Sequence, residues 1–193
     1  MRFFDVAALP VSPWRNGGGD TREIAYSPGE GHGFRWRASV ATIAADGPFS
    51  AFPGVDRTIT LLAGDGVTLS ADAVPAHELV RVGEPFSFSG DLPIRASLGG
   101  GACRVLNIMT MRGAWAADVR RTAAETTPRA GGSGLLYVLA GTWQSGATVL
   151  TAGQGAWWDG DSEGAVTPLA PDSVALEAGI RDVRDMRGRR SYA

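Results

Sequence analysis

The chain has 193 residues, of which 44% are hydrophobic and 20% are charged, a composition typical of a folded globular protein rather than a disordered one. The formal net charge is -2 and every cationic side chain is an arginine, so the chain lacks the basic balance of a protein that grips nucleic acid. The single cysteine, Cys103, excludes an intrachain disulfide framework and a cysteine-rich zinc site.

The sequence gives no sign of a membrane partner or of export. No apolar run approaches the roughly 20 residues that are needed to span a bilayer. The first residues also lack the apolar segment of a signal peptide. We therefore expect a cytoplasmic protein without a membrane partner.

The predicted elements are short strands, because 27 glycines and 11 prolines interrupt the chain. Residues 34–43 alternate large apolar with polar or small residues, which predicts a half-buried strand. Residues 57–62 and 67–69 are expected to form a hairpin around the glycine turn at 63–66. Further strands are predicted at residues 104–111, 135–139 and 173–178, and at residues 112–124 a strand is favoured over a short helix.

Two landmarks in the first half of the chain return in the second half in the same order. Residues 61–64 (Leu-Leu-Ala-Gly) return as residues 138–141 (Val-Leu-Ala-Gly), an offset of 77 residues. Residues 83–91, which begin with Gly and end with Gly-Asp, return as residues 153–161, an offset of 70 residues. The order indicates an internal duplication with an insertion or deletion in a loop.

The duplication predicts an all-β protein made of two similar units of the double-sheet jelly-roll kind. We expect an N-terminal half at residues 1–111 and a C-terminal half at residues 112–193, packed as one compact unit. Residues 1–33 precede the first copy and are expected to pack on it.

A glycine-rich loop is the sharpest local signal. It reads Trp14-Arg15-Asn16-Gly17-Gly18-Gly19. Three glycines allow positive φ angles and close approach, and free N–H groups in such a turn can form an anion-binding nest. The alternative is a tight turn followed by an ordinary surface pair, Arg22 and Glu23.

Arg37 and Ser39 lie two residues apart on a predicted strand, so their side chains point the same way. If Trp36 packs in the core, both side chains face the interior of the barrel. An inward guanidinium needs a carboxylate, either from a bound ligand or from an internal acid such as Glu23 or Asp56. The sequence leaves these two alternatives open.

Three further polar residues are candidates for the same site. Arg57 is expected to add a second cation at the mouth of the barrel, while Asp56 caps a turn. Asn107 lies on the strand face opposite Leu106 and Ile108, where it either contacts a ligand carbonyl or satisfies a backbone group.

Templates for metal binding and catalysis fit the sequence poorly. The chain has no His-x-His pair, and its two histidines, His32 and His77, are expected in loops. No nucleophile elbow is present, and Cys103 is expected to be a small buried hydrophobe. We therefore assign no cofactor, no metal ligand and no catalytic residue.

Several segments together resemble the HutD/Ves family of bacterial bicupins. They are residues 14–24, 36–41 and 46–57, followed by residues 86–91 and 106–109. The family pattern often has Asp-Phe-Asn-x-Met where this chain has Val105-Leu106-Asn107-Ile108-Met109, so no role of that acid carries over. The resemblance implies a duplicated cupin of the RmlC-like jelly-roll type, with two β-barrels packed as a bicupin. It places the glycine loop over the barrel mouth.

The resemblance also implies a role connected with histidine utilisation, in which a small acidic product such as formylglutamate is bound rather than transformed. We accordingly predict a metal-free cupin whose partner is a small carboxylated metabolite. The predicted ligand-binding residues are Trp14, Arg15, Asn16, Gly17, Gly18, Arg22, Glu23, Arg37, Ser39, Asp56, Arg57 and Asn107.

Two alternatives stay open at this point. One is a metal-free hydrolase or isomerase that uses Glu23, Asp56 or His77 as a base. The other is a structural or interaction protein with a vestigial pocket. A homodimer is a further expectation, because jelly-roll sheets have edges that must be paired or covered.

Overall fold

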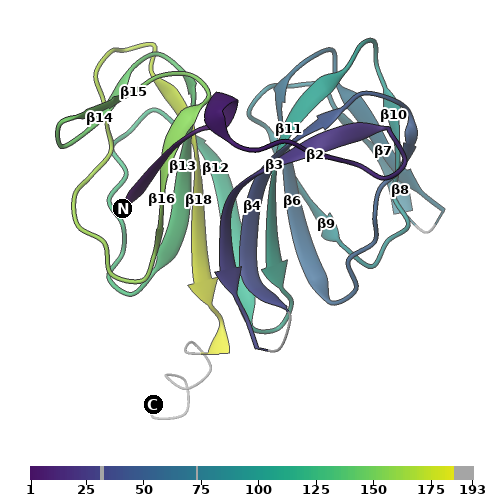
Figure 1. Ribbon diagram of the computed structural model, residues 1–193, viewed down its shortest axis with the longest axis horizontal. Helices are drawn as coiled ribbons and strands as arrows, with labels where there is room; N and C mark the ends of the chain where they lie inside the picture. The colour runs from purple at the N-terminus through teal and green to yellow at the C-terminus, as the bar shows by residue number, and fades with distance from the viewer. Residues whose placement is uncertain (31–32, 73, 185–193) are drawn as a thin grey trace.

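The computed structural model describes residues 1–30, 33–72 and 74–184 (Figure 1). These residues form four antiparallel sheets and one short 3-10 helix, η1 (Val6–Ala8). Within the described ranges, no helix is long and apolar enough to cross a bilayer. The all-β class predicted from the strand periodicity is confirmed.

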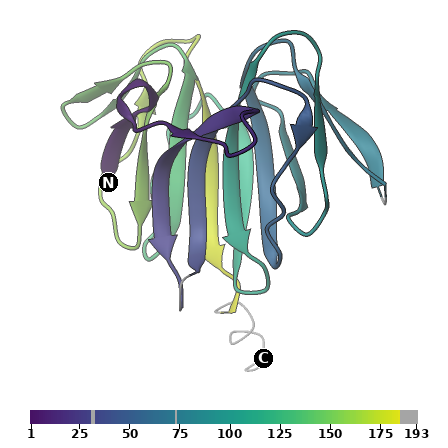
Figure 2. The ribbon, with the colours of Figure 1, turned by 45° about the vertical axis from the view of Figure 1, so that its right-hand side comes forward.

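Two large sheets form the centre of the molecule (Figures 1 and 2). The six-stranded sheet has the order β2-β3-β4-β11-β6-β9, with bounds Ser12–Pro13, Gly19–Pro28, Phe34–Ile43, Cys103–Met111, Val55–Ala63 and Pro85–Ser89. The five-stranded sheet has the order β1-β16-β13-β18-β12, with bounds Arg2–Asp5, Gln154–Asp159, Ser133–Ala140, Val174–Asp182 and Trp115–Thr122.

Two smaller sheets contribute to the outer cores. The four-stranded sheet has the order β5-β10-β7-β8, with bounds Gly47–Pro48, Arg95–Leu98, Val67–Ala71 and Val74–Leu79. The three-stranded sheet has the order β15-β14-β17, with bounds Thr148–Leu150, Trp143–Ser145 and Thr167–Pro168. One apolar cluster joins strands of the two large sheets, a second includes strands of the six- and four-stranded sheets, and a third includes strands of the five- and three-stranded sheets.

The predicted duplication recurs in the strand pairing. Strand β6 pairs with β11 and β9, and β13 pairs in the same way with β18 and β16. The amide of Gly83 donates to the carbonyl of Leu61, and at the corresponding positions the amide of Gly153 donates to the carbonyl of Val138. The sheets are open, so the arrangement as two closed barrels and the division between residues 111 and 112 stay predictions.

Strand β4 confirms the predicted alternation. Trp36 and Ala38 are fully buried in the core between the two large sheets, as inward-facing apolar residues of one strand face. Arg37 and Ser39 lie on the opposite face, where both line a pocket. The neighbouring strand β11 has the same division, because Asn107 faces the pocket and its two chain neighbours face the core.

Three expectations about the fold are wrong in whole or in part. Strands β6 and β7 do not form a hairpin, because the turn at residues 63–66 carries the chain from the six-stranded into the four-stranded sheet. The expectation that residues 1–33 pack on the first copy holds for β3, which pairs with β4, but is wrong for β1, which pairs with β16 before the chain crosses to β2 (Figure 1). His77 lies in β8 and stacks on Phe86 rather than in a loop, while His32 lies outside the described residues.

Candidate functional site

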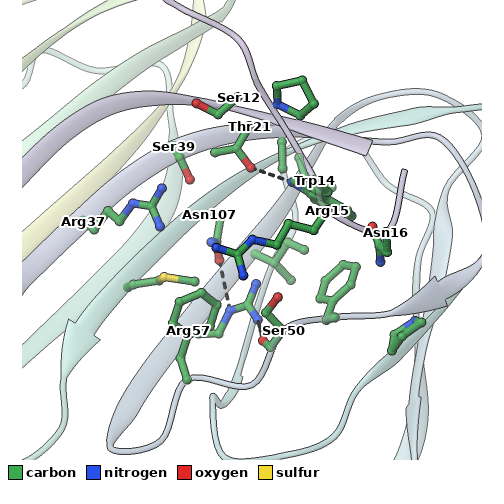
Figure 3. A pocket seen from close by; sticks show the side chains of 18 residues that line it. Ser12, Trp14, Arg15, Asn16, Thr21, Arg37, Ser39, Ser50, Arg57 and Asn107 are labelled. Carbon is green, nitrogen blue, oxygen red and sulfur yellow. Dashed lines mark hydrogen bonds between the residues drawn. The ribbon is translucent and has the colours of Figure 1, made fainter. Parts of the chain in front are cut away.

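A pocket of about 620 Å³ opens on the six-stranded sheet (Figure 3). Its floor comes from β4, β6 and β11, and its rim comes from β2, the glycine loop and the connection between β5 and β6. Its lining includes polar, cationic and apolar side chains, among them Trp14, Arg15, Arg37, Ser39, Phe49, Ser50, Phe52, Arg57, Asn107 and Met109. A concave site with apolar walls and a few polar groups is the usual form of a small-molecule pocket.

Arg57 is the buried cation of this pocket, with only 7% of its surface exposed. Its Nε atom donates to Asn107 Oδ1 at 3.4 Å and its Nη1 atom donates to the Ser50 carbonyl at 3.3 Å. Both distances are at the long end for hydrogen bonds. Among the described residues, no carboxylate forms an ion pair with this guanidinium.

Aromatic rings surround Arg57. The guanidinium carbon lies 5.4 Å from the ring centres of Phe49 and Phe52 and 5.1 Å from that of Phe88. Burial lowers the pKa of Arg57 to about 10, and the nearby charge of Arg37 acts in the same direction. The side chain therefore stays cationic near neutral pH in surroundings that penalise its charge.

Arg37 is paired with an acid of the protein itself, so a ligand is not needed to supply its counter-charge. Its Nε atom donates to Glu23 Oε2 at 2.8 Å, so an internal acid already pairs with it. About a quarter of its side chain is exposed. Of the two alternatives that the sequence left open, the internal ion pair is the one present, although Arg37 still lines the pocket.

Asn107 and Ser39 lie where the strand pattern placed them. Both are buried and both line the pocket from adjacent strands, in register with one another. Asn107 accepts the hydrogen bond from Arg57 rather than one from a backbone group. It therefore supports the buried cation.

The glycine loop is a closed turn and not an anion nest. The amide of Gly17 donates to the Trp14 carbonyl, and the amide of Gly18 donates to Asn16 Oδ1 at 3.0 Å. The predicted free N–H groups at these positions are thus used within the loop, since the Asn16 side chain forms a local turn bond. Arg15 extends from the loop into the pocket (Figure 3).

The loop is fixed to the sheet by close packing. Trp14 Nε1 donates to Thr21 Oγ1 at 2.8 Å, and its ring meets Phe49 edge-on. Gly19 lies so close to the neighbouring strand that a Cβ atom there would be 2.1 Å from the Thr42 carbonyl oxygen. Only glycine fits at this position without movement of the backbone.

Five of the twelve predicted residues do not line the pocket: Gly17, Gly18, Arg22, Glu23 and Asp56. Arg22 donates to the carbonyls of Val6, Ala7 and Leu9, where it holds the segment that crosses between the sheets. Glu23 acts through its pair with Arg37, and Asp56 pairs with Arg112.

The aromatic wall is what sequence reasoning missed. Phe49 and Phe52 lie in a Pro/Gly-rich segment whose composition by itself predicts only turns. The signal that could have identified them is two aromatic residues close before an arginine in a segment that re-enters the sheet. Within the described ranges, no group of three or more His, Cys, Asp or Glu side chains could hold a metal ion.

The fold is that of the cupin class. It matches a cupin conserved barrel domain protein from Leptotrichia buccalis with a TM-score of 0.61 at 12% identity, over 94% of this chain and 97% of the other. The chain belongs to the HutD family, whose model matches residues 6–176.

Named relatives agree with this assignment. Protein Ves of Citrobacter koseri is 43% identical over 177 residues, which cover 91% of this chain and 92% of the relative. The structure of HutD from Pseudomonas fluorescens SBW25, from a formate condition, matches with a TM-score of 0.81 at 26% identity, over 94% of this chain and 98% of the other. The family resemblance predicted from the motifs is confirmed.

Proposed function

We propose that this protein binds a small carboxylated metabolite in the cupin pocket, with formylglutamate as the reference ligand, and that this binding serves regulation of histidine utilisation. The observation that carries the proposal is Arg57, a buried guanidinium whose hydrogen-bond partners among the described residues are an amide oxygen and a backbone carbonyl, not an acid. A buried charge without a counter-charge is costly. A ligand carboxylate supplies that charge and accepts the two parallel donors of a guanidinium.

The remainder of the pocket suits a short ligand with a second polar end. Ile59 and Met109 are apolar residues of the floor, and Met109 lies opposite both Arg37 and Arg57 in the strand register. Arg15 and Arg37 line the same space, and among the described residues the Nη atoms of both make no hydrogen bond. An acid of a few carbons with a second carboxylate would meet one of these cations while its first carboxylate meets Arg57.

Binding is favoured over catalysis by the state of the candidate bases. Glu23 is paired with Arg37, and Asp56 with Arg112 at 2.7 Å. Neither carboxylate lines the pocket, and His77, the third candidate base, stacks on Phe86 and does not line the pocket either. A general base must reach the proton that it abstracts, and these two groups instead hold arginines.

The test is calorimetric titration of the wild type with N-formylglutamate, glutarate, formate and N-formylglutamine, in which an amide replaces the side-chain carboxylate. The proposal expects the strongest binding for N-formylglutamate and weaker binding for the amide. The variant Arg57→Gln should lose at least tenfold in affinity, and the surface variant Arg120→Gln should bind like the wild type. Equal heats for wild type and Arg57→Gln would contradict the proposal.

A further inference from the structure

A second arginine, far from the pocket in sequence, holds one wall of the site. Arg112 follows β11, and its Nε atom donates to Asp56 Oδ1 at 2.7 Å. Its Nη2 atom donates to the Val55 carbonyl at 3.1 Å and to Ser89 Oγ at 2.6 Å, and its Nη1 atom pairs with Asp91. One guanidinium thus joins the start of β6 to the end of β9. We call Arg112 and Asp91 the clamp.

The clamp also fixes the connection that enters β6. Asp91 Oδ1 accepts a hydrogen bond from the amide of Gly54 at 2.7 Å, and the amide of Arg112 donates to the Gly54 carbonyl at 2.9 Å. Both peptide groups of this glycine, whose φ is +75°, are therefore held by the clamp. The amide of Phe52 donates to the Gly90 carbonyl next to Asp91 at 2.7 Å.

The connection held in this way is the wall against Arg57. It carries Phe49 and Phe52, whose rings face the guanidinium, and Ser50, whose carbonyl accepts one of its two hydrogen bonds. The clamp itself is exposed and does not line the pocket. It acts on the site through this wall and through Asp56 and Ser89, which are the chain neighbours of Arg57 and of Phe88.

We propose that Arg112 and Asp91 are positioning residues that set the orientation of Arg57 for an incoming anion. The identity of the ligand in this inference rests on the proposed function. The positioning effect rests on the hydrogen bonds of Arg112 and Asp91. A guanidinium binds a carboxylate bidentately only in one orientation, and small displacements of a preorganised group weaken recognition strongly. Loss of the clamp would let the wall move and would let Arg57 turn away from the pocket.

The test compares Asp91→Ala with the conservative Asp91→Asn, which keeps an acceptor oxygen for the Gly54 amide. The matched control is Arg120→Ala, which breaks the exposed Arg120–Glu177 pair on the five-stranded sheet. We expect Asp91→Ala to weaken binding of N-formylglutamate about tenfold, Asp91→Asn less, and the control not at all. Binding is measured well below the unfolding temperature of each variant.

A spectroscopic readout separates positioning from a merely structural role. The Nε–H signal of Arg57 in ¹⁵N-labelled protein is assigned by its loss in Arg57→Met. It should exchange with water at least about tenfold faster in Asp91→Ala than in the wild type. If both exchange and affinity are unchanged while the unfolding temperature falls, the clamp is structural and the inference is wrong.

The two proposals fail separately. If the wild type binds none of the acids, the proposed function is wrong, and the exchange of the Arg57 signal alone decides whether the clamp positions this side chain. If Asp91→Ala does not fold, Asp91→Asn is judged by the same exchange criterion, with faster exchange supporting the clamp and unchanged exchange overturning it.

Discussion

At the scale of single residues, the buried charge of Arg57 lowers the stability of the fold and favours the binding of an anion. Its charge is buried among three phenylalanine rings and its two hydrogen bonds are long. The ring faces attract the cation, but burial without a counter-charge still costs free energy in the unliganded protein, and binding sites commonly carry costs of this kind. A carboxylate that enters the pocket would remove the cost.

Replacement of Arg57 by methionine should therefore stabilise the unliganded protein while binding is lost. An apolar side chain of similar length packs against the same rings without a buried charge, and we expect a gain of about 1 kcal/mol or more in the free energy of unfolding. Urea unfolding of wild type and Arg57→Met measures this difference. A clear loss of stability in the variant would show that the guanidinium is a structural element rather than an anion-binding group.

The pKa of Arg57 gives a second prediction. Because this pKa is lowered to about 10, the charge persists at neutral pH but is lost at a lower pH than the charge of an exposed arginine. Affinity for a fully ionised dicarboxylate should be constant between about pH 6 and pH 9 and should fall above about pH 10.

The same shift has a defined sign in stability. When the pKa of a base is lower in the folded than in the unfolded chain, the free energy of unfolding rises with pH between the two pKa values. The reason is that the unfolded chain holds more protons in this range. The stability difference between Arg57→Met and the wild type should shrink above about pH 10. Calorimetry and urea unfolding across this range check both statements, and a difference that grows would contradict them.

Residue-level prediction succeeded where strand alternation decided the outcome. The pocket-facing positions of Arg37, Ser39 and Asn107 follow from period-two patterns alone. The sequence could not decide whether Arg37 pairs with an internal acid, because ion pairing depends on cross-strand neighbours. Strand register brings Glu23 opposite Ser39, within reach of Arg37, and register is not visible in one sequence.

At the scale of elements, the glycine loop between β2 and β3 determines where Arg15 lies. Its shape depends on Gly19, which has no side chain. A Cβ atom at this position would lie only 3.1 Å from the Trp14 ring. Glycine content predicted a turn here, but it could not distinguish open amides from amides used within the loop. The same limit explains the false hairpin at residues 63–66, where glycines marked a turn between sheets rather than between paired strands.

Gly19→Ala should disturb this element specifically. The added methyl group would collide with the Thr42 carbonyl, and we expect a loss of about 1–3 kcal/mol in unfolding free energy together with weaker ligand binding. Gly47→Ala is the matched control, because a Cβ there meets nothing within 4 Å. Thermal unfolding and titration of both variants provide the check; equal behaviour of the two would refute the role given to the loop.

At the scale of the whole molecule, the repeated strand pairing allows the two halves to be compared position by position. Arg57 pairs across strands with Phe88, and the corresponding pair in the second copy is Gly134 with Trp158. A Cβ at Gly134 would lie 2.5 Å from the Trp158 ring, so the indole occupies the space beside this position. The landmarks predicted the duplication, but not this exchange of an Arg–Phe pair for a Gly–Trp pair.

The two large sheets are joined by a carboxylate. Asp159 on β16 accepts hydrogen bonds from Ser27 and Trp36 of the six-stranded sheet and from Ser133 of its own sheet, and it pairs with Arg35 at 3.1 Å. Burial alone would raise the pKa of Asp159, but these hydrogen bonds outweigh burial and lower it. The ionised form therefore stabilises the fold above its ordinary pKa, and this contribution is lost as the pH falls through the lowered value.

Asp159→Asn should destabilise the junction of the sheets without a change in ligand affinity. We expect a loss of about 1–3 kcal/mol in unfolding free energy at neutral pH, because an amide cannot accept all four donors. The deficit relative to the wild type should shrink in acid. Urea unfolding at several pH values measures it, and a deficit that does not depend on pH would contradict the assigned role.

The most direct test of the account is a crystal structure of the protein with N-formylglutamate. We predict a ligand carboxylate within hydrogen-bonding distance of the Arg57 guanidinium, with the other end of the ligand toward Arg15 or Arg37. A ligand bound elsewhere, or a pocket without ligand at a saturating concentration of N-formylglutamate, would contradict the central claim that Arg57 binds the carboxylate of a small acid.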